Sequence, residues 1–340
     1  MPHQRHPWRG RESPRRRARR DARPARVPLI PLCLASGDPR GVVRMQSQDG
    51  LILIDKDAGM TSFDVVRRVR RLAGTRKVGH TGTLDPDATG LMGVVLGRCT
   101  KLANFLTLDE KVYAFEMVLG SATDTEDASG EVIEVAGWEH VTREAFEEAM
   151  AGFLGTIQQV PPIYSALKVD GKRAHALARA GEEVHLEARP IEIFELELMS
   201  FEPPHVSMRV RCGSGTYVRA LVRDLGKAVG SVAHTRSIRR ISVGEFDLEQ
   251  AYRLDELSEE NFWEKVLSPA RMVGSLDQVH IDDEQRRAVG FGQTILVAPE
   301  LPMDAPIAVI DANDELVAIM ARKESHDPQG SRLAPRRVLI

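Results

Sequence analysis

The order of the periodic segments constrains the fold of this chain more than any other feature of its sequence. Residues 51–54 (Leu-Ile-Leu-Ile) form an apolar run typical of a buried strand, and residues 113–119 and 206–212 alternate apolar with other side chains, as strands do. Other segments carry apolar residues at helical spacing. Because strands and helices mix without regular alternation, the sequence predicts an α+β fold.

The first predicted helix carries a concentration of positive charge. It is expected to begin at Thr61 or Ser62, either of which can cap it. Its predicted buried face consists of Val65, Val66, Val69 and Leu72. Residues 67–77 hold six cations and no acid. Such runs are usually solvated faces, but this one leads directly into a loop with a candidate reactive group, so we interpret it as a phosphate-binding surface.

That loop, residues 79–86 (Gly-His-Thr-Gly-Thr-Leu-Asp-Pro), places one carboxylate where a helix or strand interior forms with difficulty. Gly79 and Gly82 are expected to let the backbone turn or approach a ligand closely, and Pro86 biases Asp85 toward an extended conformation. The ordinary interpretation is a surface turn. The neighbouring cations favour the alternative, in which Asp85 is a carboxylate presented to a ligand.

Length and composition narrow the class of protein. The 340 residues are enough for two domains and a tail. No apolar run is long enough to span a bilayer, so no membrane partner is expected. The three cysteines, Cys33, Cys99 and Cys212, indicate a reducing compartment rather than a disulfide scaffold or a zinc site. We therefore expect a cytoplasmic protein without a bound metal.

The charge is distributed unevenly along the chain. The net charge is -3, but residues 1–44 contain 12 arginines and three acidic residues, which gives this segment +9 and leaves residues 45–340 at -12. With seven prolines and no sustained apolar period, residues 1–48 are predicted to be a disordered extension. A basic arm that binds RNA and an overlong gene start explain it equally well. In the second case, Met45 would be the natural initiator.

The C-terminal segment has its own pattern. Short strands are predicted at 295–297, 307–310 and 316–320, separated by Pro, Asp and Asn turns, which indicates a small β-rich domain over residues 271–340. Residues 49–270 then form a larger domain. The chain lacks the phosphate-loop, dinucleotide-binding, zinc-protease and serine-hydrolase motifs, so these common sites are excluded.

Six motifs together resemble those of the TruB family of tRNA pseudouridine synthases. Residues 77–90 (Lys-Val-Gly-His-Thr-Gly-Thr-Leu-Asp-Pro-x-Ala-Thr-Gly) are similar to the family's catalytic motif. The others follow in family order, at 55–62 (Asp-Lys-x-x-Gly-x-Thr-Ser), 111–113 (Lys-x-Tyr), 161–168 (Pro-Pro-x-Tyr-Ser-Ala-x-Lys), 215–219 (Gly-Thr-Tyr-Val-Arg) and 238–240 (Ile-Arg-Arg). The resemblance is strong over residues 49–250. It is weak over the C-terminal segment, where it implies a PUA-like RNA-binding domain.

The resemblance implies a catalytic domain with a mixed, mainly antiparallel sheet and helical insertions. Residues 142–189, beginning with a predicted helix at 142–154, correspond to the tRNA-gripping thumb of the stand-alone bacterial enzymes. The implied reaction is isomerisation of uridine 55, in the T-loop of tRNA, to pseudouridine after base flipping. It needs no cofactor and no metal. The implied partner is the T-arm of tRNA, bound by a monomer without a guide RNA.

The resemblance also assigns roles to individual residues. Asp85 corresponds to the nucleophile, acting at the sugar or the base. Arg219 corresponds to a residue that holds both its oxygens and keeps its pKa low enough for the carboxylate to stay charged at neutral pH. Tyr113 is expected to stack on the flipped base, and Tyr217 to contact the carboxylate and serve as a base. The other expected substrate-binding residues are His80, which supports flipping, Ile238, which walls the uracil pocket, and Lys56.

Two departures from the family pattern leave the reactive groups intact: Asp57 stands where proline is usual, and His175 where tyrosine is frequent. Two alternatives stay open. Guide-RNA-dependent synthases share the motif around Asp85, although the thumb-like segment favours the stand-alone class. A non-catalytic RNA-binding or tRNA-folding protein is the second. The joint presence of the residues assigned to the reaction argues against lost catalysis, and it is compatible with an added folding role.

Overall fold

The computed structural model describes residues 48–106, 110–165, 167–169, 172–173, 184–297, 301–303, 305–323 and 331–340. Residues 47–340 form one compact unit. The predicted extension lies outside the described residues except for its last residue. Within the predicted thumb, most of residues 166–183, including His175, also lie outside the described residues. The expectations for these segments stay predictions.

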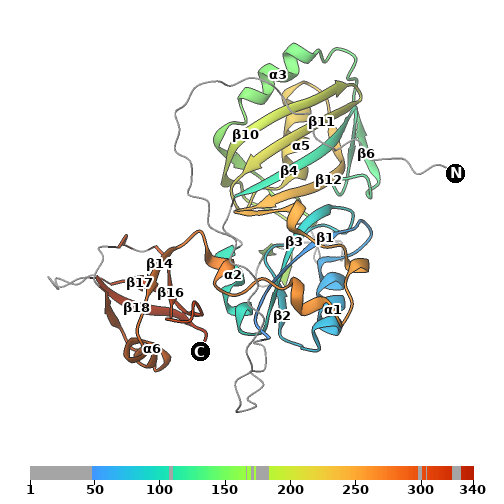
Figure 1. The fold of residues 1–340 in the computed structure, drawn as a ribbon. Coiled ribbons are helices and arrows are strands. Elements are labelled where there is room, and N and C mark those ends of the chain that lie inside the picture. The colour runs from blue at the N-terminus through green and yellow to red at the C-terminus, as the bar shows by residue number, and fades with distance from the viewer. Residues whose placement is uncertain are drawn as a thin grey trace, which may run out of the picture. The chain divides into compact units, whose positions relative to one another are not determined.

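A mixed, mainly antiparallel sheet forms the larger part of the structure (Figure 1). Its order in the described residues is β1-β3-β12-β4-β11-β10-β7, with β2 beside β3 and β13 beside β12. The strands are β1 (Gly50–Lys56), β2 (Val78–His80), β3 (Thr89–Leu96), β4 (Lys111–Leu119), β7 (Gly155–Gln159), β10 (Arg189–Glu202), β11 (His205–Cys212), β12 (Ala233–Val243) and β13 (Phe246–Asp247). Two further pairs lie outside it, β5 (Ser121–Thr123) with β6 (Val132–Val135), and β8 (Lys168–Val169) with β9 (Lys172–Arg173). The predicted α+β class is confirmed.

Two amphipathic helices pack on this sheet because their apolar faces need cover. Helix α1 (Ser62–Ala73) is capped at Thr61, which exchanges hydrogen bonds with Asp64, and it buries the four apolar residues predicted for it. Helix α5 (Val218–Ala228) begins after Tyr217 and buries Leu221 and Leu225 in the same core. The remaining helices within the described residues are α2 (Ala103–Leu106), α3 (Arg143–Ala151), α6 (Asp283–Gly290), and the 3-10 segments Gly97–Leu102, Leu248–Gln250, Leu254–Glu256, Phe262–Lys265 and Arg271–Val273.

Strands β3 and β12 of the main sheet meet in a short parallel contact. Arg239 of β12 lies opposite Thr89 of β3, and Arg240 lies opposite Gly90. Gly90 has a φ of 100°, and a Cβ there would collide with the Arg240 backbone oxygen. Only glycine fits this position, because it combines the left-handed backbone with the close approach of a neighbouring strand.

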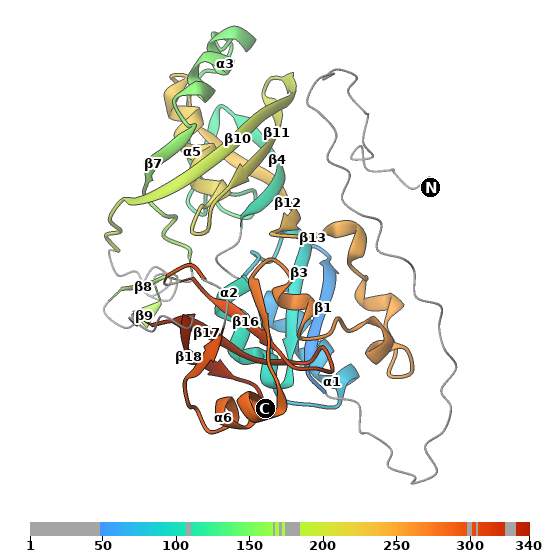
Figure 2. The same cartoon turned by 60° about the vertical axis from the view of Figure 1, so that its left-hand side comes forward.

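The C-terminal segment forms a second sheet with the order β14-β16-β17-β18-β15 (Figure 2). Its strands are β14 (Asp277–His280), β15 (Ile295–Val297), β16 (Ile307–Ile310), β17 (Leu316–Arg322) and β18 (Ser331–Val338). Ile310 and Ile319 from this sheet belong to the same buried cluster as Leu51 and Val95 from the main sheet. The boundary at residue 271 stays a prediction. Among the described helices, none is long and apolar enough to cross a membrane.

Candidate active site

Asp85 lies in the segment that joins β2 to β3. The segment, residues 81–88, is displaced by two residues from the predicted loop of residues 79–86, since Gly79 and His80 belong to β2. Leu84 is buried in the core, and the Ser62 hydroxyl donates to its carbonyl oxygen at 3.0 Å while accepting from its N–H at 2.9 Å. The residue before Asp85 is therefore fixed by both its packing and its backbone hydrogen bonds.

Lys56 secures the other side of this segment. Its side chain is fully buried, and its Nζ donates to the carbonyl oxygens of Asp57 at 3.0 Å, Pro86 at 2.8 Å and Ala88 at 2.6 Å. Burial lowers the pKa of Lys56 from 10.5 to about 8. Lys56 therefore anchors the backbone around Asp85. Its predicted role in substrate binding stays a prediction.

Arg219 contacts the Asp85 carboxylate. The Arg219 Nε lies 2.9 Å from Asp85 Oδ2, and the arginine side chain is 5% exposed whereas that of Asp85 is 38% exposed. The other guanidinium nitrogens donate to carbonyl oxygens, Nη1 to Thr125 at 2.8 Å and Nη2 to Tyr164 at 2.9 Å. The Nε makes the shortest contact with Asp85, and the two Nη groups fix the guanidinium to the backbone of two other segments. The expected bidentate hold stays a prediction.

Burial and the neighbouring charges shift the pKa of the Asp85 carboxyl in opposite directions. Burial raises the pKa of the Asp85 carboxyl above its usual range, and the nearby Asp127 carboxylate raises it further, while Arg219 and Lys56 lower it. Arg219 thus acts in the predicted direction, while burial outweighs it and the net shift is upward. The expectation that the carboxyl stays charged at neutral pH stays a prediction.

Asp127, which the sequence did not single out as a site residue, lies in residues 123–130. We call these residues the acidic loop. Its Asp127 Oδ2 lies 3.8 Å from Arg219 Nη1, on a side chain that is 24% exposed. Asp127 Oδ1 accepts from the Thr125 hydroxyl at 2.7 Å and from the Ser129 hydroxyl at 2.6 Å. The Thr-x-Asp-x-Ser spacing was the available signal, because such side chains fold a loop on itself.

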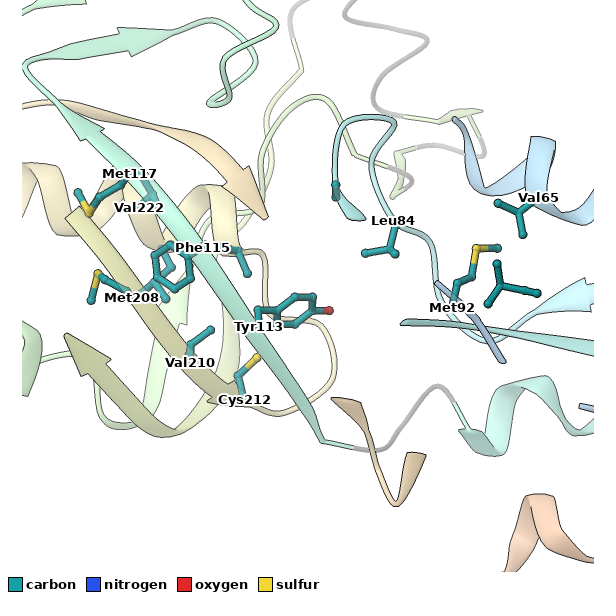
Figure 3. Packing of buried hydrophobic residues seen from close by; sticks show 14 of the residues in the cluster. Val65, Leu84, Met92, Tyr113, Phe115, Met117, Met208, Val210, Cys212 and Val222 are labelled. Atoms are coloured by element: carbon teal, nitrogen blue, oxygen red, sulfur yellow. The ribbon is translucent and has the colours of Figure 1, made fainter. Parts of the chain in front are cut away.

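Tyr113 lies on β4 at the end of a row of core residues, with its hydroxyl directed toward the side of Leu84 (Figure 3). It is only 9% exposed. Burial raises the pKa of Tyr113, and the Arg240 side chain, which hydrogen-bonds the hydroxyl, lowers it. Arg240 is itself buried and donates from Nε to the Leu91 carbonyl oxygen at 2.6 Å. An inward-facing core tyrosine is therefore what the structure shows, and base stacking remains a prediction.

Tyr217 immediately precedes α5, two residues before Arg219. The buried side chain of Gln159 brackets its backbone, accepting from the Tyr217 N–H at 2.9 Å and donating to the Tyr217 carbonyl oxygen at 3.2 Å. Burial raises the pKa of Tyr217, and a hydrogen bond with the Ser165 side chain lowers it. Because the net shift is upward, the phenol keeps its proton at neutral pH. That favours a hydroxyl that donates hydrogen bonds over one that removes protons.

His80 contacts the loop backbone rather than the Asp85 carboxylate. Its Nδ1 accepts from the Gly82 N–H at 3.3 Å. Burial lowers the pKa of His80, and the positive charge of Arg240 lowers it further, so the neutral ring is favoured. His80 therefore supports the turn that leads to Asp85, and its role in base flipping stays a prediction.

A recess of about 190 Å³ lies beside the Asp85 carboxylate. Asp85, Arg219 and Ile238 all line it, so the structure brings together three of the predicted site residues. The other lining residues are Asp87, Ala88, Asp127, Ala128, Ser129, Thr235, Arg236 and Ser237. Tyr113, Tyr217, His80 and Lys56 are not part of this lining. Among the described residues, no group of three or more His, Cys, Asp or Glu is arranged to hold a metal ion.

The predicted cation run lies mainly on α1. Arg67, Arg68 and Arg71 are exposed and line a second hollow of about 430 Å³, together with the acidic residues Asp57, Asp64 and Asp255 and the apolar Met60 and Leu254. Arg70 turns inward and donates to the Val78 carbonyl oxygen at 3.2 Å. The exposed members stay candidates for phosphate contact.

Comparison with known families adds independent information. Residues 70–218 match the family model of the TruB family pseudouridylate synthase N-terminal domain, and residues 219–279 match the tRNA pseudouridylate synthase B C-terminal domain. The chain is 41% identical over 288 residues to tRNA pseudouridine synthase B of Mycobacteroides abscessus, covering 82% of this chain and 94% of that protein. The tRNA pseudouridine synthase B of Haemophilus influenzae is 38% identical over 292 residues, covering 84% of this chain and 93% of that protein.

Solved structures share the fold. One protein in a crystal structure of a Cbf5-Nop10-Gar1 complex is 26% identical with a TM-score of 0.67, covering 86% of this chain and 85% of that one. A chain in the archaeal box H/ACA sRNP Nop10-Cbf5 complex is 25% identical with a TM-score of 0.66, covering 86% of both chains.

Proposed function

Because this chain belongs to the TruB family of pseudouridylate synthases, we propose that it isomerises uridine 55 in the T-loop of tRNAs to pseudouridine, with Asp85 as the nucleophile. The observation that carries the assignment of Asp85 is its contact with Arg219. A carboxylate held at 2.9 Å by a buried arginine lines a recess with an apolar wall residue, Ile238. The substrate assignment is supported by the relatives, which are named tRNA pseudouridine synthase B.

The reaction requires little from the protein beyond one nucleophile and accurate positioning. The N1–C1′ bond of uridine breaks, a C5–C1′ bond forms, C5 loses its proton and N1 gains one, so the atoms balance without an added reagent. Asp85 in its ionised form would attach to the sugar or the base while the uracil turns. The Arg219 guanidinium supports that role, since it stabilises the carboxylate against the upward effect of burial on its pKa.

The target base must leave its stack, which costs a few kcal/mol. Stacking against Tyr113 would return roughly 1 to 3 kcal/mol. Such a contact requires the base to enter between Tyr113 and the Asp85 segment, the side toward which the Tyr113 hydroxyl is directed (Figure 3). Ile238 would supply an apolar wall for the uracil. In this proposal the exposed arginines of α1 contact phosphates of the T-arm.

The test uses unmodified tRNA transcripts and no guide RNA. Wild-type protein should form pseudouridine at position 55, mapped by primer extension after chemical labelling and by mass spectrometry, and a transcript with cytidine at position 55 should not be modified. Asp85→Asn should bind the transcript and form no product. The matched control is Asp87→Asn, which removes a carboxylate from the same segment and the same recess but should keep activity.

Each outcome separates a different part of the proposal. Product formed by Asp85→Asn would contradict the nucleophile assignment. Product at another uridine would contradict the position but not the chemistry. A wild-type protein that modifies RNA only when a guide RNA is added would favour the guide-dependent class, and binding without any product would favour an RNA-folding protein.

A further inference from the structure

Arg223 lies one helical turn beyond Arg219 on α5, and it contacts the same two segments of the chain. Its Nη1 lies 2.6 Å from Glu126 Oε1 in the acidic loop, and its Nη2 donates to the Val160 carbonyl oxygen at 2.9 Å. Arg219 contacts Thr125 in that loop and Tyr164 in the second segment. Residues four apart on a helix lie on one face, so the two arginines form a pair of parallel links.

The contacts alternate along the acidic loop. Thr125 and Asp127 meet Arg219, and Glu126 between them meets Arg223. Glu126 has a φ of 61°, in the left-handed region that non-glycine residues seldom occupy, so other contacts must hold it there. Its carbonyl oxygen accepts from the Thr235 N–H of β12 at 3.0 Å. Glu126 is therefore fixed through its backbone to the sheet and through its carboxylate to α5.

The Glu126–Arg223 pair is largely shielded from water. The two side chains are 16% and 19% exposed, respectively. Burial raises the pKa of the Glu126 carboxyl, while Arg223 lowers it. Arg223 also contacts the Asp224 carboxylate at 2.8 Å, so it keeps a counterion when Glu126 is lost. Loss of Arg223, in contrast, leaves Glu126 as a poorly solvated charge, and the loop then has a strong tendency to rearrange.

We propose that the Glu126–Arg223 ion pair is a positioning device for the reaction: it holds the left-handed turn of the acidic loop so that Thr125 and Asp127 fix the Arg219 guanidinium against Asp85. Glu126 and Arg223 do not line the recess of Asp85 and touch no reacting atom. They act through Arg219, whose Nη1 has its partners in that loop. This inference deepens the proposed function and rests on it.

The experiment compares Glu126→Gln, Arg223→Met and Arg223→Lys with wild type in single-turnover reactions on tRNA transcript at saturating enzyme. We expect Glu126→Gln and Arg223→Met to lower the rate constant roughly 10- to 100-fold, because small displacements of a positioned group are costly, while tRNA affinity stays near wild type. Arg223→Lys keeps the charge and should recover part of the rate. The double variant Glu126→Gln/Arg223→Met should be little slower than either single variant, since each substitution removes the same Glu126–Arg223 contact.

A matched control separates positioning from simple stabilisation. Arg209→Met breaks the exposed ion pair between Arg209 of β11 and Glu197 of β10, which has a 3.5 Å contact and lies outside the predicted thumb. It should not change the rate. Glu126→Gly relieves the left-handed backbone but removes the carboxylate, and it should remain slow. Unfolding by urea, followed by circular dichroism, checks that each variant is folded at the assay temperature.

The outcomes are decisive in both directions. Folded Glu126→Gln and Arg223→Met proteins with the wild-type rate constant would overturn the inference, as would a loss confined to tRNA affinity or a Glu126→Gly protein with full activity. If Glu126→Gln or Arg223→Met is unfolded, Arg223→Lys decides: a folded, slow variant with normal affinity supports the inference, and a wild-type rate overturns it. A wild-type protein that forms no pseudouridine would refute the proposed function instead, so the two failures are distinguishable.

Discussion

Two buried cations flank the Asp85 segment, and they hold it in different ways. Lys56 binds only carbonyl oxygens of the backbone, at 2.6 to 3.0 Å. Arg219 also binds carbonyl oxygens, but its Nε contacts the Asp85 carboxylate directly. The comparison indicates two different roles. Lys56 determines where the backbone of the segment lies, and Arg219 determines the orientation and charge of the Asp85 side chain. Loss of Lys56 should therefore affect mainly stability, and loss of Arg219 mainly rate.

The largest expected effect comes from removing the cation that contacts the carboxylate. Arg219→Met should lower the single-turnover rate constant by about 100- to 1000-fold, the range found when one electrostatic partner in an active site is lost. The carboxylates of Asp85 and Asp127 would then face each other without their shared cation. The measurement is pseudouridine formation under saturating enzyme. A folded variant with a wild-type rate constant would break the distinction between the two cations.

The second effect concerns the backbone anchor. Lys56→Met leaves three carbonyl oxygens of the segment without their donor, and it should lower the free energy of unfolding by about 1–3 kcal/mol, measured by urea denaturation. Its rate loss should be smaller than that of Arg219→Met. Lys101→Met is the matched control, because the Lys101 Nζ also donates to a carbonyl oxygen, that of Val338 at 3.0 Å, but in an exposed position. An equal loss in both variants would contradict the role of burial.

The third effect is a difference between Lys56 and Arg219 in how their contributions to the free energy of unfolding depend on pH. The pKa of Lys56 is lowered to about 8 in the folded protein from 10.5. Between these values the unfolded chain holds a proton that the folded protein has released, so the Lys56 contribution to stability increases as pH rises from about 8 to 10.5. The difference in unfolding free energy between wild type and Lys56→Met should increase over that range. The corresponding difference for Arg219→Met should stay level, because arginine keeps its charge. A level Lys56 difference would contradict the lowered pKa.

The smallest effect is a shift in the acid limb of the pH–rate profile. Asp127 raises the pKa of Asp85, so Asp127→Asn should lower that pKa and move the acid limb to lower pH, even though the variant is slower. Arg219→Lys, with a less well-placed cation, should move the limb to higher pH. Single-turnover rates measured across the acid limb for the wild type and each variant would show the shifts. Shifts in the same direction would contradict the opposing roles of the two groups.

The parts of the fold predicted correctly are those decided by neighbours in sequence. The Thr61 cap and the buried face of α1 follow from spacing within one helix, and the alternation at Tyr113 and Phe115 identifies β4 because side chains in a strand alternate between faces. The α+β class follows from the order of such segments. None of these depends on which distant parts of the chain meet.

The parts that the sequence could not predict depend on contacts between distant segments. The Nη groups of Arg219 donate to carbonyl groups of Thr125 and Tyr164, which lie 94 and 55 residues away in sequence. Lys56 likewise reaches carbonyl oxygens 30 and 32 residues away. Asp127 was missed for the same reason. A motif identifies a reactive residue type, whereas its partners are determined by the tertiary fold.

The contact between β3 and β12 consists of two residue pairs, and Gly90 leaves no space there for any other side chain. Arg240, on β12, also reaches the Gly82 carbonyl oxygen at 3.3 Å, in the segment that carries Asp85. One arginine thus links the joint of the sheet to the backbone of that segment. Variants that loosen this joint are therefore expected to lower thermal stability and to displace the Asp85 segment together.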